Sequence, residues 1–286
     1  MESGTKYEFR REEDWNLLVL PGQWGEGLRK ELLGQLESHA PDHHPQTARF
    51  DYPAGENGAT FYLKIYHSVR FFGSVKDLFR DSKAFRALKQ GTVLSGLGFH
   101  VPLAVAAGEQ RRYRSLKRAF LLTLSVKARP LPLFLRESFS PPLEKSALKQ
   151  KREYIAKLAQ EVRHLHELGF VHGDLVPSNI LIRPEAGGAT FFFVDNDRTR
   201  RYPCWLPLLL WRRNLVQLNR FRLAGISLQD RLRFLNSYLS PDHGREKRRR
   251  LIQRLERKTR ERLEERDPRA ARVSFRKLMR WSKPSS

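Results

Sequence analysis

The pattern of hydrophobic and polar residues predicts strands early in the chain and helices later. Residues 60–66 are β-branched and aromatic and predict a strand, and residues 118–126 predict another for the same reason. Between them, the spacing of residues 82–97 predicts a helix that Ser82 can cap. Residues 41–58 are rich in Pro, His, Asp and Gly and therefore predict a loop, with room for one short strand.

The clearest helical pattern covers residues 146–168, where apolar side chains recur at intervals of three, four and seven residues. Ser146 can cap the start of this helix, and Gly169 suits a left-handed conformation just after its end. A short polar loop follows at once. The apolar residues 190–194 then predict a strand that runs directly into Asp195.

The last part of the chain predicts helices, with helical apolar spacing at residues 206–221, 227–238 and 245–266. The motif RPLP at residues 129–132 interrupts regular structure and suits a connector. We therefore expect an α+β protein with two lobes. Residues 1–126 form a small β-rich lobe with one helix, and residues 127–286 form a larger, mostly helical lobe.

Composition supports a folded protein with a polyanionic partner. The 286 residues are 40% hydrophobic and carry a net charge of +23. Residues 64–286 hold 48 basic and 20 acidic residues, whereas residues 1–63 hold 6 and 11. Nucleic acid, an anionic membrane surface and a phosphorylated glycolipid are all compatible with this charge.

Several classes of protein are disfavoured by the sequence. Cys204 is the single cysteine, which excludes an intrachain disulfide and a cysteine-rich zinc site. Residues 1–15 lack an apolar core, so we expect no signal peptide. The longest apolar run, residues 203–211, is far shorter than the roughly 20 residues of a membrane-spanning helix. We therefore expect a soluble or peripheral protein.

Three features with a shared chemistry occur in one order along the chain. Lys64 lies in a predicted strand, an H-x-D-x-x-x-x-N loop contains His172, Asp174 and Asn179, and Asp195 ends the strand after it. Phosphoryl transfer needs a fixed cation near the phosphates and a carboxylate that accepts the proton of the attacking hydroxyl. It also needs hard oxygen ligands for magnesium, which aspartate and asparagine side chains provide.

This order of residues resembles the protein-kinase-like superfamily. The loop HGDLVPSNIL and the later VDNDR look like those of the bacterial lipopolysaccharide core kinases, the family of the Kdo kinase and the heptose kinase. The resemblance runs from about Phe61 to about Glu265. It includes YLKIY at residues 62–66, GFHVP at residues 98–102 and the stretch 213–239, which is more similar to the heptose kinase.

The resemblance implies transfer of the γ-phosphate of ATP to a sugar hydroxyl, on heptose or Kdo, of the lipopolysaccharide inner core. By motif position, Lys64 would hold the phosphates of ATP and Asp174 would be the catalytic base. Asn179 and Asp195 would hold Mg²⁺. The reaction would take place on the cytoplasmic side of the inner membrane, with a lipid A core acceptor as partner.

Within the first lobe, the resemblance places the backbone of Leu124 to Val126 opposite the adenine of ATP. Two departures from the family pattern accompany this nucleotide-binding assignment. No G-x-G-x-x-G loop precedes the strand lysine, and the helix position of the usual glutamate partner of that lysine falls on Ala87. Asp77 or Asp81 could substitute for the missing glutamate.

Alternatives remain open from the sequence. The missing glutamate allows a weak or inactive kinase-fold adaptor that binds lipopolysaccharide or nucleotide, and the same site would also suit a soluble or protein acceptor. The charge alone would suit nucleic acid, but no motif specific for nucleic acid is present. The basic helix 245–266 and the tail after it predict attraction to the anionic inner membrane, or a merely solvated face. The run 202–211 suits either a core helix or an interfacial patch.

Overall fold

The computed structural model describes residues 6–39, 45–53, 58–67, 80–112, 115–203, 209–239, 244–268 and 272–280. The chain divides into two compact units, which we describe one at a time. The first contains Met1–Lys127 and Phe193–Arg198, and the second contains Ala128–Phe192 and Thr199–Ser286. The segment that contains Asp195 therefore belongs to the first unit, although it follows most of the second in sequence.

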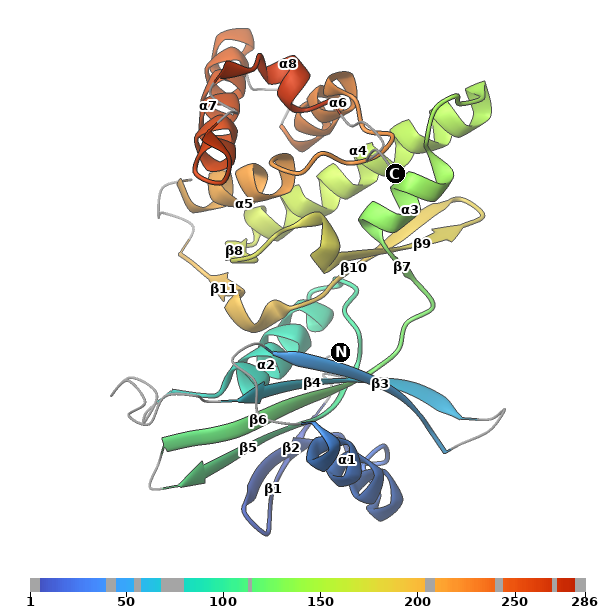
Figure 1. Cartoon of the computed structure of the whole chain (residues 1–286), viewed down its shortest axis with the longest axis vertical. Coiled ribbons are helices and arrows are strands. Elements are labelled where there is room, and N and C mark those ends of the chain that lie inside the picture. The colour runs from blue at the N-terminus through green and yellow to red at the C-terminus, as the bar shows by residue number, and fades with distance from the viewer. Residues whose placement is uncertain are drawn as a thin grey trace. The chain divides into compact units, whose positions relative to one another are not determined.

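The first unit is built on a six-stranded antiparallel sheet with the order β1-β2-β5-β6-β4-β3 (Figure 1). Its strands are β1 (Glu8–Glu12), β2 (Trp15–Val19), β3 (Gln46–Tyr52), β4 (Ala59–His67), β5 (Ala104–Arg112) and β6 (Ser115–Leu124). Its helices are α1 (Glu26–Ser38), α2 (Lys83–Gly96) and the 3₁₀ turn η3 (Asn196–Arg198).

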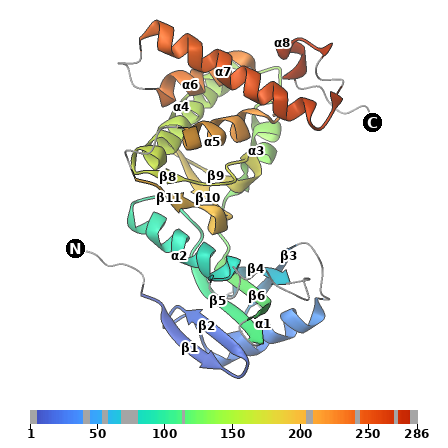
Figure 2. The same cartoon turned by 90° about the vertical axis from the view of Figure 1, so that its left-hand side faces the viewer.

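Two helices cover opposite faces of this sheet (Figures 1 and 2). On one face, Leu28, Leu32 and Leu36 of α1 pack with buried residues of the sheet such as Leu63. On the other face, α2 packs around Tyr66. Because side chains alternate along a strand, Lys64 shares the face of Tyr66 and therefore lies on the α2 side of the sheet.

The strand predicted at residues 60–66 and the helix predicted at residues 82–97 are confirmed as β4 and α2. The cap is also confirmed, because Ser82 Oγ accepts a hydrogen bond from the Phe85 N–H at 3.2 Å. Residues 41–58 are expected to form a loop with room for one short strand, and the described part of this segment contains one strand, the seven-residue β3. This edge strand buries only Phe50, so it lacks the apolar alternation of a core strand.

The second unit is mostly helical. Its helices are α3 (Leu131–Ser138), α4 (Lys145–Glu167), α5 (Leu209–Asn219), α6 (Leu228–Tyr238), α7 (Arg245–Glu264), α8 (Phe275–Leu278) and the 3₁₀ turn η2 (Pro177–Asn179). Its short strands are β7 (Arg129–Pro130), β8 (Phe170–Val171), β9 (Ile180–Glu185), β10 (Gly188–Phe193) and β11 (Arg200–Arg201). They form two small sheets, β10-β9-β7 and β11-β8.

Helix α4 confirms the helix predicted at residues 146–168, and it begins one residue earlier. The predicted cap is wrong, because Glu144 is the N-cap residue and no side chain caps this end of the helix. Gly169 has the expected left-handed conformation, with φ +82. A Cβ atom there would lie 2.5 Å from the Tyr202 carbonyl oxygen, so glycine is needed for both backbone geometry and space.

The three later helices are confirmed as α5, α6 and α7. The apolar run at residues 202–211 falls largely outside the described residues. Its last residue, Trp211, packs against the rings of His166 and Tyr238, with ring centroids 6.3 Å and 5.6 Å away. Trp211 is therefore part of the helical core. Among the described residues, no helix combines the length and apolar character needed to cross a membrane.

Candidate functional site

Lys64 and Asp195, two of the residues identified from the motif, lie together in the first unit. The Lys64 Nζ atom lies 2.6 Å from Asp195 Oδ1, and the two side chains are 27% and 29% exposed. Asp195 has a positive φ of 64, and the Phe193 N–H just before it donates to the His100 carbonyl oxygen at 3.0 Å. Asp195 is thus held at a tight turn beside the strand lysine.

The ion pair shows how Lys64 finds a carboxylate without a glutamate from α2. Ala87, at the expected glutamate position, is 6% exposed and packed in the interior. Asp81 is not a substitute, because its Oδ2 atom pairs with Lys89 Nζ at 2.7 Å. Asp77 lies outside the described residues. Asp195 itself is therefore the carboxylate that positions the lysine.

Helix α2 holds the Asp195 turn through an arginine. Arg86 donates from Nε to the Asp197 carbonyl oxygen at 3.3 Å and from Nη1 to the Asp81 carbonyl oxygen at 3.1 Å. Tyr66 is buried in the cluster that packs against α2. Burial raises the pKa of Tyr66 well above its usual value, and the charges of Asp195 and Asp197 raise it further. Arg86 thus links α2 to the Asp195 turn. In the family pattern, a glutamate of this helix would instead pair with the strand lysine.

The start of α2 is tied to the sheet by a buried carboxylate that sequence analysis did not identify. Glu109 on β5 is 7% exposed and accepts from the Ser82 N–H at 3.1 Å. Arg111 neutralises Glu109, with Nε 2.7 Å from Oε1, and also donates to the Arg80 carbonyl oxygen at 2.8 Å. This network fixes the end of α2 that precedes Arg86.

The segment predicted to face adenine follows β6. The Leu124 N–H is already bonded to the Leu103 carbonyl oxygen at 2.8 Å, and the Ser125 N–H to the Thr60 carbonyl oxygen at 2.8 Å. Within the described part of the chain, the backbone of Val126 makes no hydrogen bond. Of the two residues named from the resemblance, Val126 therefore has the backbone groups available for a base.

In the second unit, the loop of Asp174 is tightly folded on itself. The Asp174 N–H donates to the His172 carbonyl oxygen at 2.8 Å, and the Val176 N–H donates to the Asp174 carbonyl oxygen at 2.9 Å. Asn179 donates from Nδ2 to the same Asp174 carbonyl oxygen at 3.0 Å. His172 is fully buried, and its carbonyl oxygen also accepts from Thr199 Oγ1 at 3.3 Å. The structure thus fits a structural role for His172.

A glutamine on α5 holds the Asp174 loop from the side. Gln217 donates from Nε2 to the Gly173 carbonyl oxygen at 3.1 Å and lies 3.4 Å from Asp174 Oδ1. Its Oε1 atom accepts from the Leu175 N–H at 3.3 Å. Gln217 therefore fixes the backbone on both sides of Asp174 and one oxygen of its carboxylate, while Oδ2 makes no hydrogen bond within the described residues.

A second amide and a histidine extend this network. Asn214 accepts from the His172 N–H at 3.1 Å and donates to Gln217 Oε1 at 3.0 Å. His166 Nε2 lies 3.0 Å from Asn214 Oδ1, and its Nδ1 lies 2.9 Å from the Tyr238 hydroxyl. Burial lowers the pKa of His166 to about 4, which the hydrogen bond with Asn214 opposes only in part. The neutral ring donates to Asn214 and accepts from Tyr238.

These side chains are compatible with Mg²⁺. Asn179 uses its amide nitrogen to hold the loop, so its Oδ1 atom remains an acceptor. Asp195 gives one oxygen to Lys64 and keeps the other. Mg²⁺ prefers such hard oxygen ligands and is commonly held by few protein groups together with substrate phosphates. Among the described residues, no group of three or more His, Cys, Asp or Glu forms a separate metal site.

Comparisons with known proteins agree with this arrangement. The model of the lipopolysaccharide kinase (Kdo/WaaP) family matches residues 60–238. A search of curated proteins finds no significant match. One similar solved structure is WaaP in complex with acyl carrier protein, with 19% sequence identity and a TM-score of 0.60, covering 86% of this chain and 98% of that chain. This match confirms the kinase-like, two-lobed α+β fold. Because the family model matches more than half of the residues, the chain belongs to the lipopolysaccharide kinase (Kdo/WaaP) family.

Proposed function

We propose that the protein is an ATP-dependent kinase that transfers the γ-phosphate to a sugar hydroxyl, on heptose or Kdo, of the lipopolysaccharide inner core. The observation that carries this proposal is the fixed carboxylate of Asp174, with Gln217 3.4 Å from Oδ1. An inactive adaptor has no need of a preorganised base. The ion pair of Lys64 with Asp195 adds support, because the lysine is paired despite Ala87.

Each residue has a role in this reaction. Asp174 Oδ2 orients the sugar hydroxyl and accepts its proton as the oxygen–phosphorus bond forms and the bond to ADP breaks. Lys64 neutralises charge on the phosphates, and the Val126 backbone faces the base. Asn179 Oδ1 and Asp195 are the groups that would hold Mg²⁺. The metal ion supplies neutralisation of charge on the β- and γ-phosphates.

Transfer to a panel of acceptors tests this function. Lipid A carrying Kdo, and the same lipid extended with heptose, are incubated with Mg²⁺ and [γ-³²P]ATP. We expect label on one of the two acceptors, and we expect Lys64→Met and Asp195→Asn to abolish it. Label on neither acceptor, from protein that binds ATP, would contradict the lipopolysaccharide substrate. Label that persists in Asp195→Asn would contradict the metal assignment.

We also propose that α7 holds the enzyme at the anionic cytoplasmic face of the inner membrane. The inward side of α7 buries Leu251, Leu255 and Thr259. At its start, Arg245 and Arg249 are exposed and form no ion pair within the described part of the chain. Each Lys or Arg near an anionic surface contributes about 1 kcal/mol, so a few such residues are enough to localise the protein.

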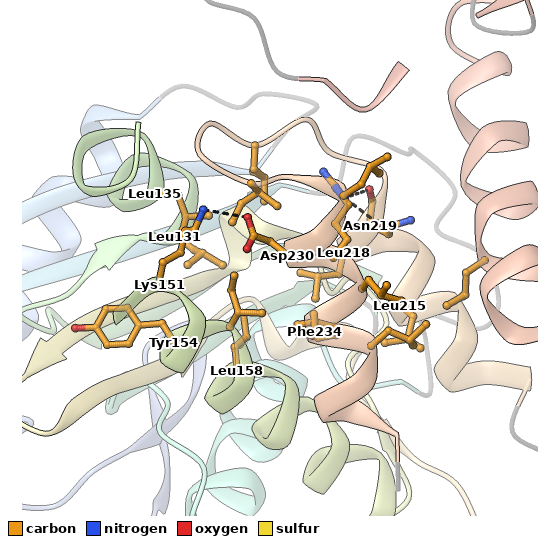
Figure 3. A pocket seen from close by; sticks show the side chains of 18 of the residues that line it. Leu131, Leu135, Lys151, Tyr154, Leu158, Leu215, Leu218, Asn219, Asp230 and Phe234 are labelled. Carbon is orange, nitrogen blue, oxygen red and sulfur yellow. Dashed lines mark hydrogen bonds and ion pairs between the residues drawn. The ribbon is translucent and has the colours of Figure 1, made fainter. Parts of the chain in front are cut away.

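An apolar pocket in the second unit supports a further partner. It has a volume of about 340 Å³ and is lined mainly by aliphatic residues such as Leu158, Leu215 and Leu218 (Figure 3). The charged residues in its wall neutralise each other, with Lys151 Nζ 3.0 Å from Asp230 Oδ2. A pocket without net charge suits an uncharged hydrocarbon chain. We propose that it receives an acyl group, presented by acyl carrier protein.

Binding of acyl carrier protein tests this partner. We expect the palmitoylated form to bind more tightly than the form with a free pantetheine thiol. Leu218→Phe, which narrows the pocket, should remove this difference in affinity between the two forms. Leu232→Phe, at an exposed position of the pocket wall, should leave the difference unchanged. Equal affinity of the wild type for both forms would contradict an acyl site.

A further inference from the structure

One face of α5 places two arginines beside the carboxylate of Asp174. Arg213, Gln217 and Arg220 are four and three residues apart, so their side chains share one side of the helix. Arg220 continues the helical turn, because its N–H donates to the Val216 carbonyl oxygen at 3.0 Å. Gln217 on this side of the helix reaches Asp174, and the charges of both Asp174 and Arg213 act on Arg220.

The turn that follows α7 carries a third arginine whose charge acts on Arg220. Asn219 Nδ2 donates to Thr259 Oγ1 at 3.0 Å, which joins the end of α5 to α7 (Figures 1 and 2). Arg266 lies in the turn just after α7, two residues beyond its end at Glu264. The pKa of Arg220 is lowered by burial and then by the charge of Arg266, while the charge of Asp174 acts in the opposite direction.

These three arginines lie close to few opposite charges, and the carboxylate charge that acts on Arg220 is that of Asp174. Among the described residues, Arg213, Arg220 and Arg266 form no ion pair. The Nε atom of Arg220 is buried and has no hydrogen-bond acceptor. Bringing like charges together and burying an unsatisfied donor both destabilise the folded protein. An anion bound between the guanidinium groups would relieve both effects.

We propose that Arg213, Arg220 and Arg266 form a binding subsite for a phosphate or carboxylate group of the acceptor, next to the hydroxyl that Asp174 activates. This inference rests on the proposed function and adds a requirement on the substrate: the acceptor carries negative charge close to the reacting hydroxyl. Guanidinium groups suit this task because they bind phosphate and carboxylate oxygens with two parallel hydrogen bonds.

Binding of a delipidated inner-core oligosaccharide tests the subsite. The probe is used in two forms, with its phosphates and Kdo carboxylates, and after removal of the phosphates with hydrofluoric acid. The variant Arg213→Gln/Arg220→Met is compared with Arg245→Gln/Arg249→Gln, which loses the same charge at the far end of α7. We expect the first variant to bind about 10- to 100-fold more weakly than the wild type, and the second to stay within about twofold.

The two forms of the probe identify the anion. If removal of the phosphates abolishes the difference between the wild type and Arg213→Gln/Arg220→Met, the subsite binds phosphate. If the difference persists, it binds carboxylate. Equal weakening by both double variants would overturn the proposal, because it would show only a response to overall charge.

Thermal unfolding shows whether Arg220 serves a binding subsite or only stabilises the fold. It also shows whether a failed binding test contradicts the subsite or the proposed acceptor. At low salt, we expect Arg220→Met to raise Tm, because an unsatisfied cation is removed while packing against Phe221 is kept. A fall in Tm would overturn the proposal. If the wild type binds neither oligosaccharide, the lipopolysaccharide acceptor is wrong. The subsite is then tested with tripolyphosphate in a Lys64→Met background. Binding of tripolyphosphate should raise the Tm of this protein, and adding Arg220→Met must remove that ligand-induced rise.

Discussion

The buried His166 makes the stability of the second unit depend on pH. The folded protein lowers the pKa of His166 from 6.5 to about 4, mainly by burial. Between these values the unfolded chain binds the proton and the folded protein does not. The free energy of unfolding therefore falls as the pH is lowered through this range. The stabilisation is complete above pH 6.5.

The size of the effect follows from the shift. One pKa unit corresponds to about 1.36 kcal/mol, so the full contribution of His166 is about 3 kcal/mol. At pH 5 the free energy of unfolding is about 2 kcal/mol lower than at pH 7.5 because of His166. A loss of that size is measurable, since small proteins are stable by only about 5–15 kcal/mol in total.

The assay is urea unfolding, followed by far-ultraviolet circular dichroism at pH 7.5, 6.5, 5.5 and 5.0. His166→Gln is the matched variant, because its amide can donate to Asn214 and accept from Tyr238 but does not titrate. All other titrating groups are shared by the two proteins. We expect the stability of the wild type relative to the variant to fall by about 2 kcal/mol from pH 7.5 to pH 5. A difference that stays constant with pH would refute the reasoning.

Three further expectations concern the site and the membrane. Gln217→Met should lower kcat by about 10- to 100-fold with little change in the KM for ATP, because it loses its contact with Asp174, whereas Arg212→Gln on the same helix should retain turnover. Equal loss of kcat in both variants would contradict the positioning role. Asp174→Ala should lower turnover by about 100- to 10,000-fold and leave ATP binding intact, as measured by isothermal titration calorimetry; full turnover would contradict the assigned base. Arg245→Gln/Arg249→Gln should weaken binding to phosphatidylglycerol vesicles in a flotation assay, and unchanged flotation would make α7 a solvated face.

Much of the fold could be predicted because its main elements carry strong local patterns. Helix α4 has a regular apolar face, and β4 is a run of aromatic and β-branched residues. The segment of β3 predicts only a loop with room for one short strand, because β3 is an edge strand with one buried side chain and its pattern resembles that of a loop. The helix α1 was missed, although Leu28, Leu32 and Leu36 recur at helical spacing.

The candidate site could be predicted only as far as its motif extends. The motif residues lie within or next to helices and strands that have clear apolar patterns. They are the strand lysine, the loop around Asp174 and the aspartate after β10. Gln217 was not identified, because a glutamine in an amphipathic helix has no distinctive local pattern, and its partner Asp174 lies 43 residues away in sequence. The same holds for Arg86, which bonds to a backbone carbonyl 111 residues away. Such partners depend on tertiary packing.

The central claim is tested most directly by the mass of the acceptor. Purified protein is incubated with Mg²⁺, ATP and a lipopolysaccharide core that keeps its lipid A phosphates and Kdo carboxylates but carries no phosphate on its core sugars. The core is analysed by mass spectrometry beside a reaction with Asp174→Asn. We expect a gain of one phosphate with the wild type and no gain with the variant. No gain with the wild type, although it binds ATP, would contradict the account and favour an adaptor or another acceptor.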